Sequence, residues 1–189
     1  MILSTFAITL GFVAATAASQ ASKPQTSGSQ ISGATPQPLH VRNGFEFTVN
    51  APQSVVAPLF GAHRERLWAE GWDPQFIYPQ PAPIEDKAGE VFTIQHGSHT
   101  STWINTALDF ENGHIQYTYV IPDAMAVLID IRLAASGPSA THVAVTYERT
   151  ALSPALNDHV RQQGEADAKS APHWQKAIED YLKNKAAKP

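Results

Sequence analysis

The sequence predicts an α+β fold in which one antiparallel sheet is combined with a long C-terminal helix and two short helices after the first strand. Three observations lead to this prediction. Six strand-like segments with short turns follow one another between residues 75 and 150. Two short helical patterns, broken at Pro58 and Gly61, precede these segments, and a long helical pattern starting at Ser153-Pro154 follows them. Strands at this spacing indicate an antiparallel sheet rather than alternating parallel units.

Length and composition restrict the domain organisation and the classes of function. The chain has 189 residues, of which 43% are hydrophobic and 16% charged, which is typical of a soluble chain with one main domain. A net charge of −4 argues against a nucleic-acid partner, because binding to a phosphate backbone needs clustered Lys and Arg. The absence of cysteine from the sequence excludes disulfides, thiolate metal sites and thiol nucleophiles.

The first segment, residues 1–21, is interpreted as a signal peptide. Residues 1–18 are uncharged and largely apolar, and small residues in Ala15-Thr16-Ala17 and Ser19-Gln20-Ala21 provide two cleavage patterns. No Lys or Arg precedes the apolar run. An uncleaved membrane anchor formed by residues 1–18 is therefore the alternative, because about 18 apolar residues approach the length that spans a bilayer.

The next segment, residues 22–40, is expected to be a flexible linker. Ser, Gln, Gly, Thr and Pro dominate it, so it has no apolar face whose burial could offset the entropy of ordering. The folded domain is then predicted at residues 41–185, which is long enough for one core. With the preceding signal, this domain is expected to be exported to the periplasm or secreted, with a membrane tether as the alternative.

The first strand and the helix pair are read from local patterns. Residues 44–50 alternate apolar and polar side chains, as in a half-buried strand. Asn50 is expected to cap the first short helix, and Pro52 suits its first turn, where a missing N–H costs nothing. The second short helix is expected at residues 62–68.

The sheet is completed by six further segments. Asn112-Gly113 is a typical hairpin turn, and Gly97-Ser98 marks another turn between two of the strands. In the last three strands the residues of one parity are mainly apolar, so this face is expected to point to the helix. The six strands are expected at residues 75–78, 90–95, 100–110, 115–121, 124–134 and 141–150.

The C-terminal helix has two unlike halves. Its second half has an apolar stripe that includes Trp174 and Ile178, which assigns Trp174 to the core. In the first half, Gln163 and Asp167 interrupt the inward face, so they either contact a polar group of a ligand or show that this half has turned away from the sheet. Pro172 is expected to kink the helix or to split it in two.

This order of elements is the helix-grip arrangement, and four segments of the chain resemble the SRPBCC superfamily of START-related, polyketide-cyclase-like and pollen-allergen-like domains, in particular bacterial-type members without a common assigned reaction. The resemblance covers about residues 45–182. It implies a curved antiparallel sheet wrapped around the long helix, with a cavity between them that holds lipids, sterols, aromatic polyketides or hormones in members. Some members catalyse cyclisation or dehydration there. The segments are Val49-Asn50-Ala51-Pro52 with Leu59-Phe60, Leu67-Trp68-Ala69-Glu70-Gly71-Trp72-Asp73-Pro74, Ser101-Thr102-Trp103, and Val145-Thr146-Tyr147 through Thr150-Ala151-Leu152-Ser153.

Aromatic side chains dominate the candidate ligand-binding residues. Large rings with one polar edge suit an apolar ligand, and a buried tyrosine hydroxyl needs a hydrogen-bond partner that a ligand can supply. Trp68 and Trp72 are expected at the mouth of the cavity, where the helix pair returns to the sheet. Packing in the core is the alternative for each ring. The predicted ligand-binding residues are Trp68, Trp72, Trp103, Tyr117, Tyr119, Tyr147 and Gln163.

The sequence shows no clear motif for metal binding, cofactor binding or catalysis. His96 and His99 flank a predicted turn, and two imidazoles alone do not make a catalytic metal site, so neither a metal nor a cofactor is expected. Arg149, near a strand end, is interpreted as solvated, and an inward position in which it pairs with an acidic ligand is the alternative. We therefore expect the protein to bind a small hydrophobic or amphipathic molecule, lipid-like or aromatic, in the cavity. The alternatives are a cyclase- or dehydratase-like enzyme and an interaction module that holds no ligand.

Overall fold

The computed structural model describes residues 35–82 and 84–187. The predicted signal peptide and residues 22–34 of the predicted linker lie outside the described residues. From residue 37 onward, the described residues form one compact unit by their contacts. Within this unit, the side chain of Asn157 bonds to the backbone of Gln37 and Leu39, which fixes the chain immediately before the first strand.

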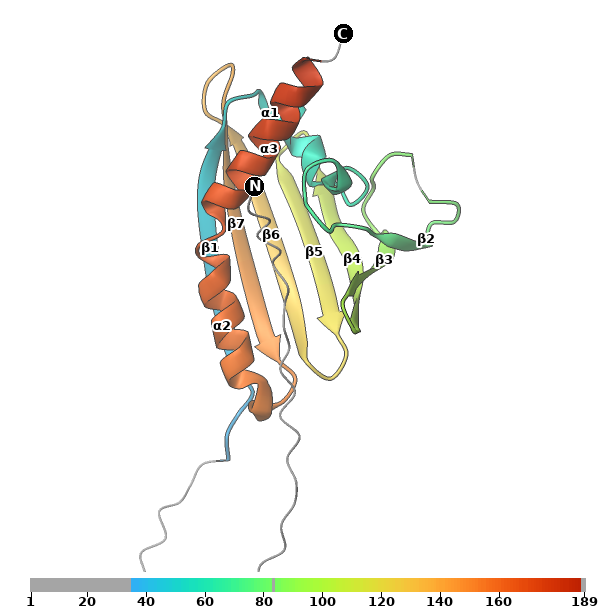
Figure 1. The fold of residues 1–189 in the computed structure, drawn as a ribbon, viewed down its shortest axis with the longest axis vertical. Helices are drawn as coiled ribbons and strands as arrows, with labels where there is room; N and C mark the ends of the chain where they lie inside the picture. Colours follow the sequence, from blue (N-terminus) through green and yellow to red (C-terminus); the bar gives the residue numbers. More distant parts are fainter. Residues whose placement is uncertain (1–34, 83, 188–189) are drawn as a thin grey trace, which may run out of the picture. The chain divides into compact units, whose positions relative to one another are not determined.

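The described residues contain a single curved sheet of seven antiparallel strands (Figure 1). Its spatial order is β1-β7-β6-β5-β4-β3-β2, so only the first strand leaves the meander and crosses to pair with the last. This arrangement confirms the predicted fold class. The strands are β1 (His40–Val49), β2 (Gln75–Tyr78), β3 (Val91–His96), β4 (His99–Asp109), β5 (His114–Ile121), β6 (Met125–Ala135) and β7 (Thr141–Ala151).

Short helices follow β1, as predicted: α1 (Gln53–Val56) continues into η1 (Ala57–Phe60), and η2 (Glu65–Leu67) comes after a turn. The predicted cap is wrong. No side chain caps α1, whose N-cap residue is Pro52, and Asn50 instead donates to the carboxylate of Glu179 in the last helix.

The C-terminal helix is split, one of the two outcomes expected from Pro172. A turn η3 (Pro154–Leu156) leads into α2 (Asn157–Asp167), and Pro172 lies in the first turn of α3 (Ala171–Ala186), where its missing N–H leaves no bond unmade. Both helices contact β1, and Figure 1 shows them over the β1–β7 side of the sheet. Of the helices in the described part of the chain, none is both long and apolar enough to span a membrane.

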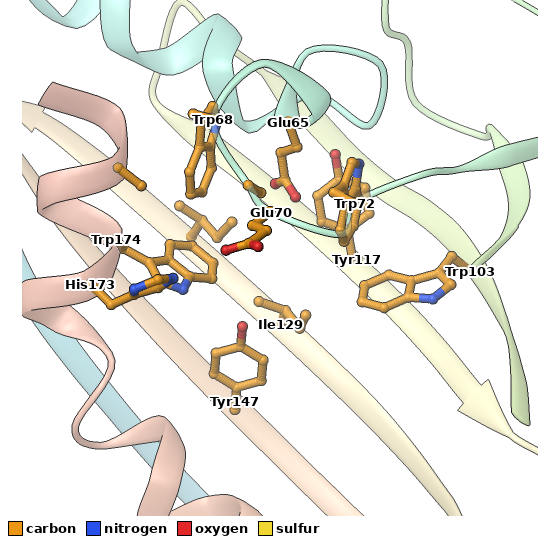
Figure 2. A pocket seen from close by; sticks show the side chains of 13 residues that line it. Glu65, Trp68, Glu70, Trp72, Trp103, Tyr117, Ile129, Tyr147, His173 and Trp174 are labelled. Atoms are coloured by element: carbon orange, nitrogen blue, oxygen red, sulfur yellow. The ribbon is translucent and has the colours of Figure 1, made fainter. Parts of the chain in front are cut away.

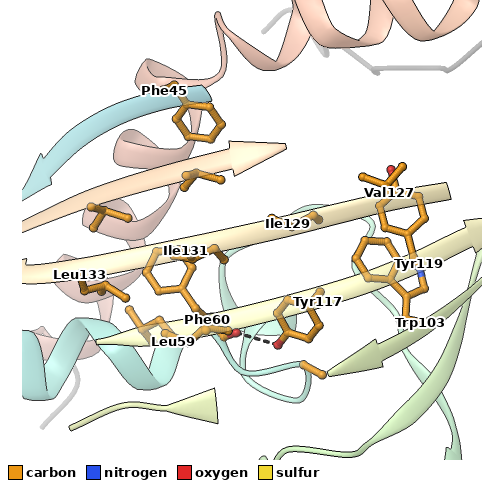
Figure 3. Close-up of a cluster of buried hydrophobic side chains, with 14 of the residues drawn as sticks. Phe45, Leu59, Phe60, Trp103, Tyr117, Tyr119, Val127, Ile129, Ile131 and Leu133 are labelled. Carbon is orange, nitrogen blue, oxygen red and sulfur yellow. Dashed lines mark hydrogen bonds between the residues drawn. The ribbon is translucent and has the colours of Figure 1, made fainter. Parts of the chain in front are cut away.

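The core lies between the concave face of the sheet and these helices. The predicted strand parity is confirmed, since Val127, Ile129 and Ile131 of β6 are buried together with Tyr117 of β5 (Figure 3). The hydroxyl of Tyr117 donates to the backbone carbonyl of Phe60 at 2.7 Å, which ties the short helices to the centre of the sheet. This bond satisfies a polar group that would be costly to bury alone.

A buried ion pair holds α2 on the sheet. Arg149 shares the parity of Tyr147, so its side chain points inward, and the solvated interpretation of Arg149 is wrong. Its guanidinium donates to both carboxylate oxygens of Asp167, at 2.6 and 2.8 Å, and to the hydroxyl of Tyr119 at 2.7 Å. Asp167 therefore neither faces a ligand nor marks a helix turned away. Gly164 allows this approach, because a Cβ there would lie 2.3 Å from the Asn43 amide of β1.

Candidate functional site

A cavity of about 160 Å³ lies on the concave side of the sheet, between its central strands, the segment of residues 65–72 and α3 (Figure 2). This is where the resemblance implies a cavity. Most of its lining is aromatic or aliphatic. The lining residues are Glu65, Trp68, Ala69, Glu70, Trp72, Trp103, Tyr117, Ile129, Ile131, Tyr147, His173, Trp174 and Ala177.

One wall is an aromatic cluster between the helices. Trp68 and Trp174 meet edge to face, with ring centroids 5.4 Å apart, and both rings contact Phe60. Trp174 also contacts Phe45 of β1, at 5.2 Å. The indole N–H of Trp68 donates to the backbone carbonyl of Leu59 at 2.7 Å, which fixes the ring against the η1 segment. The wall is thus held by packing and by a hydrogen bond that leaves no free donor on Trp68.

The opposite wall belongs to the sheet and to the end of the 65–72 segment. Trp72 and Trp103 meet edge to face at 5.1 Å, and both contact the ring of Tyr117. The indole N–H of Trp72 donates to the carbonyl of Ala62, and that of Trp103 donates to the hydroxyl of Ser101, each at 2.7 Å. These bonds leave ring faces and hydrocarbon edges as the surface that a ligand would meet.

Two polar groups enter the cavity without a partner in the described part of the chain: the carboxyl of Glu65 and the hydroxyl of Tyr147 (Figure 2). Burial raises the pKa of Glu65 well above its ordinary value, and the nearby charge of Asp86 raises it further. Burial also raises the pKa of Tyr147. The lining therefore offers a carboxyl group that favours its neutral form and a neutral phenol, both able to bond to a ligand.

The exposed rim carries two further polar residues, Glu70 and His173. No lysine or arginine lines the cavity. The guanidinium of Arg149 faces inward and lies over the ring of Tyr147, 4.8 Å from its centroid, and it is neutralised by Asp167. The charged groups of the lining are thus acidic, apart from an imidazole at the rim.

The structure brings five of the seven predicted residues together in this lining: Trp68, Trp72, Trp103, Tyr117 and Tyr147. The other two lie elsewhere. Tyr119 stacks on Trp103 at 4.0 Å and accepts a hydrogen bond from Arg149, and Gln163 is half-buried on α2; neither lines the cavity.

Sequence reasoning missed Glu65 and underestimated Trp174. The ring of Trp174 packs on the core, as predicted, and it also lines the cavity. Trp68 does both as well, so the two tryptophans cannot be assigned one to the cavity mouth and the other to the core. Glu65 could have been found, since it lies three residues before Trp68, a spacing that places the two side chains on one side of a helical turn.

A second group of buried carboxyls lies behind the η1–η2 segment. One oxygen of Asp86 accepts from the backbone N–H of His63 at 2.5 Å, and one oxygen of Glu90 accepts from the N–H of Lys87 at 2.9 Å. Within residues 35–82 and 84–187, the second oxygen of each carboxyl has no hydrogen-bond partner. Burial raises the pKa of Asp86, and burial raises the pKa of Glu90 to about 7. These groups do not line the cavity.

Among the described residues, no three His, Cys, Asp or Glu side chains are placed to hold a metal ion together. His96 and His99 pair across the β3–β4 hairpin, as their position beside a predicted turn indicated.

No protein-family model and no curated protein matches the chain. Solved structures do. Norcoclaurine synthase from Thalictrum flavum is similar with a TM-score of 0.55 at 12% identity, over 89% of this chain and 100% of that one. An uncharacterised protein from Rhizobium leguminosarum has a TM-score of 0.54 at 16% identity, over 78% and 97%. A major latex-like protein from Panax ginseng has a TM-score of 0.52 at 13% identity, over 76% and 97%.

Identities this low establish the fold and nothing finer. The likenesses cover the sheet and the helices, and they confirm the helix-grip fold, which is the fold type of the SRPBCC superfamily. A fold of this kind hosts different functions, so the ligand and any reaction have to be argued from the cavity of this chain.

Proposed function

We propose that this protein binds a small apolar or amphipathic molecule in the cavity between the sheet and α3, and that it is a member of the SRPBCC superfamily. The observation that carries the proposal is the lining: six aromatic rings around about 160 Å³, with a carboxyl and a hydroxyl that have no hydrogen-bond partner among the described residues. An apolar cavity with a few convergent polar groups is the usual form of a small-molecule site.

The size of the cavity limits the ligand. An apolar cavity of about 150 Å³ holds one benzene-sized molecule. A ligand with one ring, or a short branched aliphatic group, therefore fits the closed part, and any longer portion has to leave past Glu70 and His173 at the rim. Full burial of such a body contributes about 25 cal/mol for each Å² of apolar surface removed from water.

Native mass spectrometry of the protein purified from its own host tests this proposal. We expect a co-purified molecule that is lost in a variant with a filled cavity, such as Ile129→Phe, and retained in Ile104→Phe, which changes the same residue type at an exposed position of β4. Titration of tryptophan emission with one-ring compounds gives an independent measurement. The absence of both a bound molecule and any response to these probes would contradict ligand binding and favour a ligand-free interaction module.

A dehydratase-like enzyme is the second candidate, and the buried carboxyl of Glu65 is the observation that favours it. A carboxylic acid kept neutral by burial can protonate a leaving hydroxyl. The resulting carboxylate can then take a proton from the adjacent carbon, so that an alkene and one water leave the site. Incubation with the co-purified molecule, followed by mass spectrometry, would reveal a product lighter by one water that Glu65→Gln fails to form.

We also propose that the domain is exported. The support is the uncharged apolar run of residues 1–18 and the small residues that follow it. Fractionation of the full-length protein, with N-terminal sequencing of the mature form, tests this location. Cleavage near residues 17–21 is the expected result, an intact N-terminus in the membrane fraction would indicate an anchor, and an intact cytoplasmic protein would refute export.

A further inference from the structure

The cavity collects every tryptophan of the chain. The sequence contains four, Trp68, Trp72, Trp103 and Trp174, and all four line the same 160 Å³ together with the rings of Tyr117 and Tyr147. The face of an aromatic ring carries partial negative charge and attracts cations, most strongly in tryptophan. A purely apolar ligand needs no such selection, because aliphatic side chains fill and line a cavity equally well.

Most hydrogen-bond donors of these six rings are turned away from the cavity. Three indole N–H groups donate to Leu59, Ala62 and Ser101, and the hydroxyl of Tyr117 donates to Phe60. The lining is therefore poor in donors while its ring faces remain available. Such a surface matches a ligand that brings its own donors or positive charge.

The lining formed by the described residues includes no lysine or arginine. Its two carboxyl groups are Glu65, which is buried, and Glu70 at the exposed rim. Figure 2 shows the carboxyl of Glu65 between the two tryptophan walls. A buried carboxyl without a partner is unfavourable when ionised, and a bound cation would supply the missing counter-charge.

From this lining we infer that the ligand is a small organic cation, an amine or a quaternary ammonium compound with an apolar body of about one ring, held between the carboxylate of Glu65 and the tryptophan faces. The inference rests on the proposed binding function and names the ligand class of the same cavity. Burial raises the pKa of the unoccupied Glu65, so binding of a cation also releases a proton from this carboxyl to solvent.

The test compares cations with neutral molecules of the same shape. Choline is paired with 3,3-dimethylbutan-1-ol, and benzylamine with benzyl alcohol, and each is titrated by calorimetry and by tryptophan emission into the purified protein. We expect at least one cation to bind about tenfold or more tightly than its neutral counterpart, the size of a desolvated cation–π and charge contact. Phosphatidylcholine vesicles carry the trimethylammonium group of choline: co-sedimentation together with a choline response assigns a headgroup as the source, and a choline response alone assigns a free cation.

Variants assign the contact to its residues. Glu65→Gln keeps the size of the side chain and is expected to weaken cation binding about tenfold while leaving the neutral counterpart within about twofold. Glu111→Gln, the same change in the exposed β4–β5 turn, is the matched control and is expected to change neither. Trp174→Phe is expected to weaken binding of the cation several-fold. This variant keeps the test decisive if Glu65→Gln fails to fold.

The outcomes separate this inference from the proposed function. Neutral counterparts that bind as tightly as the cations would overturn the cation inference and leave the binding of an amphipathic molecule standing. Binding of none of the four probes would overturn the cation inference, and it would also overturn the proposed function if no molecule co-purifies with the protein. A cation preference that survives unchanged in both Glu65→Gln and Trp174→Phe would overturn the assignment of the cation to this cavity.

Discussion

Replacement of Asp167 by alanine is expected to be one of the most destabilising single changes in this domain. The carboxylate accepts two hydrogen bonds from Arg149, at 2.6 and 2.8 Å, and the two side chains are only 11% and 6% exposed. Asp167→Ala leaves the guanidinium buried with the hydroxyl of Tyr119 as its remaining oxygen partner. Removal of one member of a buried pair costs about 3–5 kcal/mol, because the surviving charge keeps its desolvation penalty.

Two further estimates support this magnitude. Two hydrogen bonds to charged groups, at about 1.5–3 kcal/mol each, give about 3–6 kcal/mol. For a domain of about 150 residues, 1 kcal/mol corresponds to about 2–4 °C in the melting temperature, so a decrease of about 6–20 °C is expected. Urea unfolding followed by tryptophan emission and by circular dichroism measures the change, and the slope of the transition should stay constant if only stability has changed.

The same helix supplies the control. Asp158 and Arg161 form an ion pair on the exposed side of α2, with side chains 85% and 52% exposed. Asp158→Ala also deletes an aspartate carboxylate, but one that is exposed to water. We therefore expect the free energy of unfolding to fall by less than about 0.5 kcal/mol. A loss below about 1 kcal/mol for Asp167→Ala, or equal losses for the two variants, would refute the reasoning. The double change Arg149→Met with Asp167→Leu should recover most of the stability, because it buries no charge.

Three further outcomes are expected. Gly113 has φ of 67° and an added Cβ would lie 2.2 Å from the carbonyl oxygen of Leu133, so Gly113→Ala should lower the free energy of unfolding by about 2 kcal/mol or more; an unchanged urea midpoint would contradict the clash. The pKa of Glu90 is raised from 4.5 to about 7, so the folded state binds more protons than the unfolded state between these values, and stability should fall as the pH rises through this window, by at most about 1.4 kcal/mol per pH unit. Glu90→Gln should reduce that slope in thermal melts, and an identical slope would assign it to other groups. Because burial and the charge of Asp86 raise the pKa of Glu65, benzylamine should bind more tightly at about pH 8 than at about pH 5, while benzyl alcohol binds equally; calorimetry at both pH values decides.

The fold was predictable because its signals are local and repeated. Alternating parity in four strands, an Asn-Gly turn and prolines at the starts of several helices each act over a few residues, and together they leave one arrangement of sheet and helices. The same parity also predicted correctly that Tyr117 and Tyr147 lie on the concave face. These predictions depend only on which way a side chain points, which the strand period decides.

The predictions that failed concern side chains whose hydrogen-bond partners lie far away in the sequence. The solvated interpretation of Arg149 follows the usual behaviour of a lone arginine and overlooks that the residue shares the inward parity of Tyr147. Its strand does not show the partner, because Asp167 lies 18 residues later at the end of α2. Asn50 has the side chain of a helix cap and bonds to Glu179 of α3 instead. Long-range pairs of this kind are fixed by how α2 and α3 dock, and the break at Pro172 decides that docking.

The tryptophan rings of the two cavity walls have two roles, packing in the core and lining the cavity. Trp68 and Trp174 close the core around Phe60, and Trp72 and Trp103 pack around Tyr117, yet the same rings form the surface of the cavity. Hydrogen bonds to backbone carbonyls or to Ser101 hold three of the four indoles in place before any ligand arrives. A ligand therefore has little side-chain entropy to remove from these rings on binding, so a small contact area can still give useful affinity. The polar groups left for the ligand to satisfy are the carboxyl of Glu65 and the hydroxyl of Tyr147. Of the two, the carboxyl is the group that can supply a negative charge to a cation, which is why we place the selectivity of the cavity there.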